Sequence, residues 1–274
     1  MMRRMKLTIA YDGTAYSGFQ MQPYGPTIQS VMEEALGRLL QEKVRLRAAG
    51  RTDAGVHARA QVVDFADAGR RDAETILRGG NALLPPDIRI LSAEEVPPSF
   101  DARGDAKAKE YRYFLHLHPV PSPFLLRYAW HLGRPLDLPA MREGLGHLVG
   151  EHDFSAFRGQ GCTAKRTVRK IFRAELDSRS STLWVLSVTG SGFLRHMVRV
   201  IAGTLAEVGT GRIAPGKVPS ILASGDRRQA GPTAPAPGLF LWRVAYGEDP
   251  FSLDAGGDVG SNIFFDFEGE SSHR

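Results

Sequence analysis

Residues 49–58 constrain this chain more than any other stretch of its sequence. They place a single carboxylate, Asp53, between two glycines, with an arginine two residues before it and a histidine four residues after it. Glycines permit tight backbone geometry and the close approach of a ligand, and small neighbours leave the carboxylate uncovered. Since strand-like patterns flank the segment at 44–48 and 61–65, we predict a loop that joins two strands. Taken alone, the loop also fits a simple turn in which Asp53 caps a backbone N–H.

The composition is that of an ordinary globular protein. The 274 residues are 42% hydrophobic and 24% charged, and a chain of this length can form one large domain or two related halves. The lone cysteine, Cys162, excludes an internal disulfide and a thiolate-rich zinc site. No apolar run approaches the length of a membrane span, and the first residues lack a signal-peptide pattern. We therefore expect a cytoplasmic protein that binds no membrane.

The charge of the chain is unevenly distributed. The formal net charge is +5 and the sequence pI is about 9.5. Residues 251–274 contain five acidic residues and one arginine, a net charge of −4, so the first 250 residues carry +9. A basic body favours a polyanionic partner, and nucleic acid before membrane because no basic amphipathic helix stands out. The alternative is a soluble surface that is basic without any such partner.

Hydrophobic patterns predict strands and helices that alternate along the chain. Thr27 and Asp137 each stand where a helix N-cap is expected, before an apolar stripe of helical spacing. Alternating or short apolar runs predict the strands. The predicted strands lie at 6–11, 44–48, 61–65, 88–96, 110–117, 168–176, 183–188 and 239–246, and the helices follow Thr27 and Asp137 and cover 72–78 and 193–205.

The order of these elements predicts two related halves. Each half has a strand, then Ser-Gly-Phe at 17–19 or 191–193, then a helix. We therefore expect an α+β fold in which two α/β halves form a largely antiparallel central sheet, with flanking helices and a cleft between them. The predicted division is a first half at 1–118 carrying the Asp53 loop, a proline-rich crossover at 119–136 and a second half at 137–249. The remaining 250–274 form an acidic, flexible tail, in which 263–265 could dock.

Several classes of catalytic site are excluded by spacing. The chain has eight histidines, but none of its His and Asp clusters has the spacing of a known metal site. No phosphate-binding Gly-x-x-x-x-Gly-Lys-Ser/Thr loop and no dinucleotide-binding glycine motif occurs. Cys162 lacks any motif that would mark it as a nucleophile. We therefore expect no metal and no nucleotide cofactor.

What remains is one carboxylate together with arginines and aromatic residues. Arg195, His196 and Arg199 share the polar face of the predicted helix at 193–205, which either is solvated or faces the cleft. Tyr111 begins the inner row of its strand, where a buried core tyrosine is the plain alternative. Basic and aromatic residues also interleave in a way suited to an RNA backbone. They are Phe100, Arg103, Lys107, Lys109, Arg112, Lys165, Arg166, Arg169 and Lys170.

Residues 50–57, Gly-Arg-Thr-Asp-Ala-Gly-Val-His, resemble the signature of the tRNA pseudouridine synthase A family. The resemblance extends over almost the whole chain and ends before the acidic tail. The further blocks that match lie, in order, at 11–13, 18–20, 80–88, 100–103, 109–113, 152–157, 193–199 and 238–241.

The resemblance implies the pseudouridine synthase fold and an isomerase that converts uridine to pseudouridine at positions 38, 39 and 40 of the tRNA anticodon arm, with no cofactor. Asp53 would be the nucleophile, attacking either C1′ of the sugar or C6 of the base. Arg199 would pair with Asp53 and hold its charge. The Tyr111 ring would stack on the uracil while its hydroxyl assists proton removal, and Arg51 would contact the flipped nucleotide or its phosphate.

The resemblance also implies a homodimer that binds one tRNA across both subunits. Two other functions are compatible with a basic protein of this kind. One is a non-catalytic RNA-binding or RNA-chaperone protein of the same fold, and the other is a metal-dependent nuclease, which a chelator would inactivate. Binding alone would not require Asp53, Tyr111 and Arg199 together.

Overall fold

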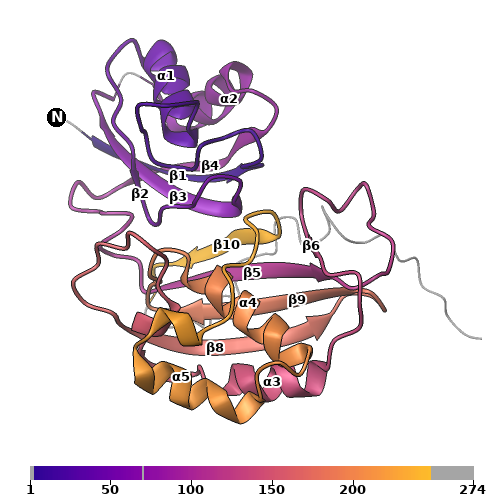
Figure 1. Ribbon diagram of the computed structural model, residues 1–274. Coiled ribbons are helices and arrows are strands. Elements are labelled where there is room, and N and C mark those ends of the chain that lie inside the picture. The colour runs from indigo at the N-terminus through magenta and orange to yellow at the C-terminus, as the bar shows by residue number, and fades with distance from the viewer. Residues whose placement is uncertain (1–2, 70, 248–274) are drawn as a thin grey trace, which may run out of the picture.

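The computed structural model describes residues 3–69 and 71–247 (Figure 1). The predictions of a flexible acidic tail at 250–274 and of docking by 263–265 fall outside these residues. Within the described part, no helix combines the length and the apolar character needed to cross a bilayer.

Ten strands form one sheet in the order β4-β1-β3-β10-β5-β9-β8-β7, with β2 paired to β3 and β6 paired to β5. Neighbouring strands are antiparallel except for the pairs β3–β10 and β5–β6, which are parallel. This confirms the predicted α+β fold with a largely antiparallel sheet. The strands are β1 (Arg3–Tyr11), β2 (Arg47–Ala48), β3 (His57–Asp67), β4 (Ile88–Val96), β5 (Ala108–His116), β6 (Trp130–His131), β7 (Gly150–Asp153), β8 (Val168–Ser178), β9 (Leu183–Gly190) and β10 (Leu239–Ala245).

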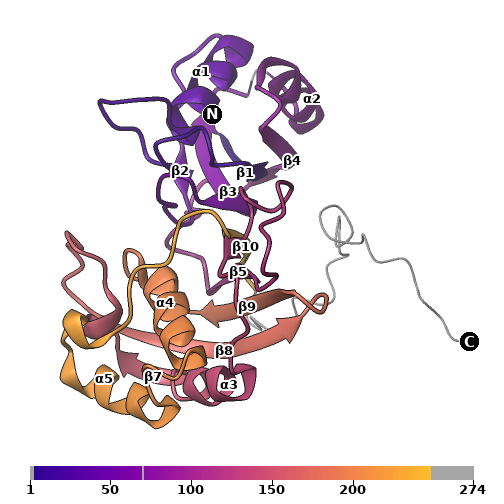
Figure 2. The same cartoon turned by 45° about the vertical axis from the view of Figure 1, so that its right-hand side comes forward.

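The helices pack on two separate parts of the sheet (Figures 1 and 2). Helices α1 and α2 lie over the part formed by β1, β3 and β4, and α3, α4 and α5 lie over the part formed by β5, β8 and β9. The junction between the two parts is therefore not covered by a helix. The helices are α1 (Ile28–Leu40), α2 (Ala73–Leu83), α3 (Leu138–Gly146), α4 (Met197–Gly209) and α5 (Val218–Ser224).

Local sequence explains where the first strand and helix lie. Alternate residues of β1 are buried from Met5 to Tyr11, as expected for a strand with one face on the core. The Thr27 hydroxyl accepts a hydrogen bond from the Ser30 N–H, and the Ser30 hydroxyl accepts one from the Thr27 N–H. This reciprocal cap satisfies two backbone donors at the start of α1 and confirms Thr27 as the N-cap.

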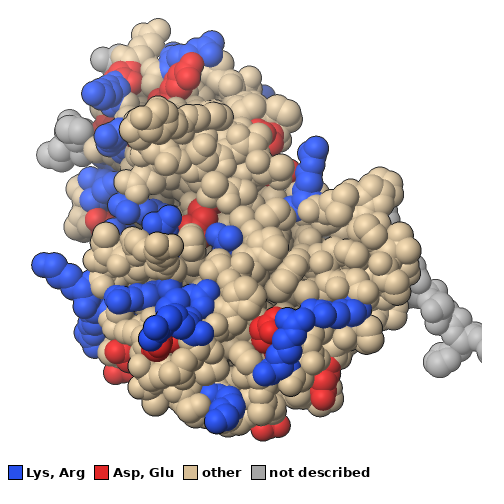
Figure 3. All heavy atoms as spheres, in the orientation of Figure 1, with Lys and Arg blue, Asp and Glu red and all other residues tan. Residues whose placement is uncertain are grey.

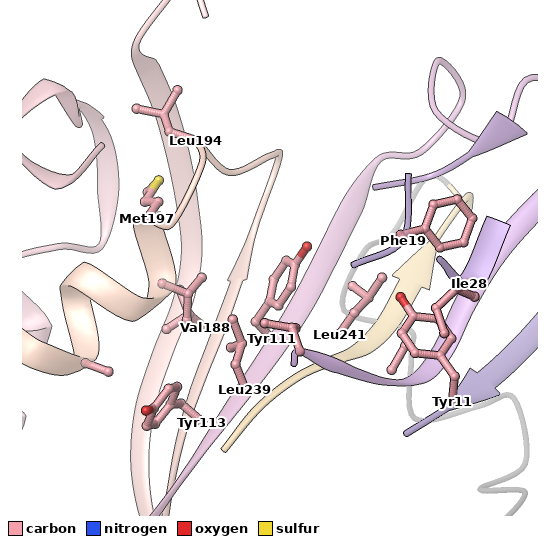
Figure 4. Packing of buried hydrophobic residues seen from close by; sticks show 14 of the residues in the cluster. Tyr11, Phe19, Ile28, Tyr111, Tyr113, Val188, Leu194, Met197, Leu239 and Leu241 are labelled. Atoms are coloured by element: carbon pink, nitrogen blue, oxygen red, sulfur yellow. The ribbon is translucent and has the colours of Figure 1, made fainter. Parts of the chain in front are cut away.

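The last strand, β10, joins the two parts of the sheet. It pairs in parallel with β3, where Phe240 lies opposite His57, and antiparallel with β5, where Leu241 lies opposite Tyr111. A single buried cluster runs across the junction, from Tyr11 and Phe19 to Tyr111, Leu239 and Val188 (Figure 4). The residues of strand β5 fall within the predicted first half, 1–118, but the strand lies between β10 and β9, which belong to the predicted second half.

One detail of the sequence analysis is wrong. The predicted helix at 193–205 begins only at Met197, because His196 has a left-handed backbone. His152 and Asp153 belong to strand β7, which follows α3. Strand β5 is buried on both faces, since Phe114 packs in a second cluster against Val185 and Ala129, on the face opposite Tyr113. The proline-rich crossover contributes that cover through Ala129.

Candidate active site

The Asp53 loop joins β2 to β3 and is fixed by hydrogen bonds on both sides. The Phe19 N–H donates to the carbonyl of Thr52 at 3.1 Å, and the Tyr11 hydroxyl lies 2.8 Å from the Thr52 hydroxyl. The Gln61 side-chain amide donates to the carbonyl of Gly50 at 2.7 Å. Because these partners come from β1, from the segment between β1 and α1, and from β3, the loop is held in one conformation.

Glycine is required where other backbone approaches this loop. Gly18 has φ +94°, and a Cβ built on it would lie 2.9 Å from the Thr52 oxygen and 3.1 Å from the Ala54 nitrogen. Gly55, at φ +75°, closes the turn that follows Asp53. Both positions are left-handed and favour glycine. The first Ser-Gly-Phe segment thus supports the Asp53 loop directly.

Asp53 contacts two residues from the second half of the chain. Arg199 Nη1 donates to Asp53 Oδ2 at 3.3 Å, and His196 Nε2 lies 3.4 Å from Oδ1. The Asp53 side chain is 29% exposed, so that part of the carboxylate still faces solvent. Arg199 is anchored separately, because its Nε donates to the carbonyl of Ala234 at 2.8 Å. The predicted pairing of Arg199 with Asp53 is therefore present.

Tyr111 rises from β5 beside the same loop. A Cβ built on Gly50 would lie 3.6 Å from its hydroxyl, and its ring meets Phe193 edge-on, with centroids 5.0 Å apart. Figure 4 shows the ring between Val188 on one side and Tyr11 on the other. Burial, and secondarily the nearby Tyr11 and Asp53, raises the pKa of Tyr111. The hydroxyl therefore stays protonated at neutral pH and can donate a hydrogen bond.

Arg51 lies on the surface at the start of the loop. It is exposed, and within the described residues no side-chain hydrogen bond or ion pair holds it. Its guanidinium is thus free to meet an anion from solvent. The structure brings Asp53, Arg199 and Tyr111 together and leaves Arg51 at the rim.

Five basic residues line a hollow of about 420 Å³ next to Tyr111's neighbour Phe193. Burial, and after it the charges of Arg103 and Arg169, lowers the pKa of Lys109 to about 8. One acidic residue, Glu151, shares the lining. Figure 3 shows Lys and Arg side chains gathered at the left of this face, at the level of the junction. The five basic residues are Arg103, Lys109, Arg166, Arg169 and Lys170.

The other residues of the predicted basic series do not line this hollow. Arg112 donates to Glu110 at 2.6 Å and lies over the Trp242 ring, 4.1 Å from its centroid. Lys107 and Lys165 are likewise absent from the lining. The basic residues predicted to contact RNA therefore divide into five that line the hollow and others, such as Arg112, that lie outside it.

His57, which ends the signature segment, is a structural residue. Its Nδ1 accepts a hydrogen bond from the Gly13 N–H at 3.1 Å, and its ring stacks on Phe240 with centroids 4.6 Å apart. Across residues 3–69 and 71–247, no three His, Cys, Asp or Glu side chains are grouped so that they could hold a metal ion.

Sequence reasoning gave no site role to His196, although it contacts Asp53. The residue was placed on a polar helix face with Arg195 and Arg199. The signal available was its position three residues before Arg199, at the start of a helix. The sequence pattern could not predict the left-handed backbone of His196, at φ 61°, which turns the side chain toward the Asp53 loop.

Comparisons with known proteins identify the family of this chain. The sequence model of a family described as tRNA pseudouridine synthase matches residues 7–103 and 145–247. A protein from Pelobacter propionicus named tRNA pseudouridine synthase A is 50% identical over 89% of this chain and 100% of its own length. One of the same name from Myxococcus xanthus is 46% identical over 93% of this chain and 97% of its own.

Among solved structures, a chain of the archaeal box H/ACA sRNP Nop10–Cbf5 complex matches 88% of this chain and 49% of its own, at 13% identity and a TM-score of 0.37. A likeness at that level supports no argument about the site. The family match and the relatives establish the family, since the matched residues include the Asp53 loop and helix α4. This chain belongs to the tRNA pseudouridine synthase family, whose members are isomerases that convert uridine to pseudouridine.

Proposed function

We propose that this protein converts uridine to pseudouridine at positions 38, 39 and 40 of the tRNA anticodon arm, with Asp53 as the nucleophile. One observation carries the proposal: a partly exposed carboxylate from the first half is paired at 3.3 Å with Arg199 from the second, beside the buried Tyr111. If Tyr111 were only a core residue and Arg199 only a solvated helix residue, neither would need to lie beside a carboxylate at this junction.

The reaction is an isomerisation and needs no added atoms. The bond between N1 and C1′ breaks, the uracil turns, and C5 is joined to C1′. The proton on C5 leaves and N1 gains one. Asp53 attacks either C1′ or C6, and the resulting covalent adduct divides one difficult step into easier ones. Arg199 offsets the charge of the carboxylate before attack and after release.

The target nucleotide has to leave its stack before Asp53 can reach it. The cost of unstacking is smallest in a loop or strained stem, which suits an anticodon arm. We propose that the Tyr111 ring stacks on the flipped uracil and that Arg51 holds the nucleotide or its phosphate. The basic hollow around Lys109 would contact the RNA backbone, so binding should weaken steeply with salt.

We also propose that the protein is a cytoplasmic homodimer that binds one tRNA across both subunits. The ordered blocks of family resemblance support this assembly. Three apolar side chains on the crossover are exposed and would suit contact with a second copy: Val120 at 65%, Phe124 at 84% and Leu126 at 55%. Light scattering of the purified chain, alone and with tRNA, measures both the subunit number and the stoichiometry.

The proposed reaction is tested by mapping pseudouridine in an unmodified tRNA transcript before and after incubation with the chain, without cofactors. We expect new pseudouridine only at positions 38–40. Asp53→Ala should abolish it while tRNA binding persists, because phosphate contacts supply most of the affinity. Asp177→Asn, at an exposed position of β8, is the matched control. Full activity of Asp53→Ala would refute the nucleophile, and binding without any product in the wild type would indicate an RNA-binding protein.

A further inference from the structure

His196 lies beside the second carboxylate oxygen of Asp53, the proposed nucleophile. Arg199 Nη1 lies 3.3 Å from Asp53 Oδ2, and His196 Nε2 lies 3.4 Å from Oδ1. His196 is the N-cap of α4 and Arg199 lies in its first turn, three positions on. Each carboxylate oxygen therefore has its own neighbour from one rigid element, which restricts rotation of the carboxylate about its Cβ–Cγ bond.

The backbone at His196 is left-handed, yet the residue forms no helix-capping hydrogen bond that would offset the strain. Its φ of 61° is one of two left-handed non-glycine values among residues 3–69 and 71–247. An N-cap residue usually has an extended backbone and accepts a hydrogen bond through its side chain. His196 has neither property, since no side-chain cap bond forms. Strain of this kind persists where the surrounding structure holds it, and it is common at functional sites.

The buried Gly159 leaves the space that the His196 imidazole occupies. A Cβ built on Gly159 would lie 2.5 Å from His196 Nδ1 and 2.7 Å from Cγ. The Gly159 N–H also donates to the carbonyl of Arg195 at 2.7 Å. Any larger residue at 159 would push the ring off its position.

Burial, aided by three neighbouring arginines, favours the neutral form of the His196 ring. Burial lowers the pKa of His196; the Asp53 charge raises it, and Arg199, Arg195 and Arg227 lower it again, with a net downward shift from 6.5. At neutral pH the neutral imidazole lies 3.4 Å from Oδ1 and leaves the carboxylate's charge uncancelled. A protonated ring would instead form a second ion pair and compete with the substrate for that charge.

We propose that His196 is a positioning residue for Asp53: its imidazole lies against Oδ1 while Arg199 binds Oδ2, so that the carboxylate meets the flipped nucleotide in one orientation. Gly159 and the left-handed backbone keep the ring there. The inference rests on the proposed role of Asp53 and adds a residue and a protonation state to it.

The test measures tritium released from C5 of labelled uridine in tRNA, in single turnovers with saturating enzyme. His196→Gly removes the ring and suits the left-handed backbone, so it should fold. We expect its rate to fall about 10- to 100-fold, as for other small misplacements of reacting groups, while tRNA binding changes by less than about twofold. Gly159→Ala should slow the reaction with the imidazole retained, and His196→Gln, which keeps a donor, should recover much of the rate.

The pH profile separates positioning from a merely structural role. In the wild type the rate should fall only below pH 6.5, because the pKa of His196 is lowered from that value and the ring gains its proton below it, and His196→Gln should lose that acid limb. His147→Gln, at an exposed histidine that ends α3, is the control. Wild-type rates for His196→Gly, or an unchanged acid limb in His196→Gln, would overturn the inference alone. Full activity of Asp53→Ala would overturn the proposed nucleophile and this inference with it.

Discussion

Arg199→Lys isolates the geometry of the arginine from its charge. Arg199 uses two different nitrogens: Nε donates to the Ala234 carbonyl at 2.8 Å, and Nη1 donates to Asp53 at 3.3 Å. A lysine has a single nitrogen on a flexible stem, so it keeps the positive charge but cannot make both contacts in the same fixed geometry.

The size of the effect follows from the contact that is lost. A hydrogen bond to a charged group contributes about 1.5–3 kcal/mol. The Arg199 side chain is 15% exposed and that of Asp53 is 29%, which favours the lower half of the range. About 2 kcal/mol corresponds to a rate loss of about 30-fold if the contact is retained in the transition state. Since tRNA is bound mainly through phosphates, the dissociation constant should change little.

The assay is single-turnover pseudouridine formation with saturating enzyme, paired with filter binding for affinity. Arg212→Lys is the matched control, because Arg212 is exposed and pairs with Glu207, away from the Asp53 loop. Circular dichroism establishes that both variants are folded. A wild-type rate in Arg199→Lys would remove the arginine from the site and refute the reasoning from its two contacts.

Two further predictions concern the loop and the basic hollow. Tyr11→Phe removes the hydroxyl that lies 2.8 Å from the Thr52 hydroxyl and should lower the free energy of unfolding by about 1 kcal/mol; urea denaturation measures this, and an unchanged midpoint would contradict it. Since the pKa of Lys109 is lowered to about 8, its charge is present below that pH and lost above it. The affinity for tRNA should therefore fall as pH rises from about 7 to 9, and Lys109→Arg should remove that dependence in filter binding.

Local patterns were sufficient to predict much of the first half. The alternation in β1 and the cap at Thr27 depend on neighbours within a few residues, which the sequence displays directly. The loop around Asp53 was also predictable, because glycines and a lone carboxylate between two strand patterns fit no regular element. The pairing of Asp53 with Arg199, separated by 146 positions, came from family resemblance and not from pattern.

The order of the sheet and the start of α4 could not be predicted in the same way. The parallel pairing of β3 with β10 joins residues far apart in the chain, and neither strand's composition specifies its partner. The apolar spacing after Phe193 is compatible with a helix from that point, whereas the left-handed backbone of His196 delays it to Met197. That backbone depends on tertiary contacts with Gly159 and the Asp53 loop, which no local pattern encodes.

The position of β10 has a consequence during synthesis of the chain. The strand that lies between β3 and β5 is the last of the described elements to be made. A nascent chain can form β1, β3 and β4 with their helices, yet it cannot close the middle of the sheet until residues 239–245 have emerged. The Asp53 loop and α4 are brought to their final separation by that step. A chain that stops just before residue 239 therefore contains both Asp53 and Arg199 but lacks the strand that joins the two parts of the sheet carrying them.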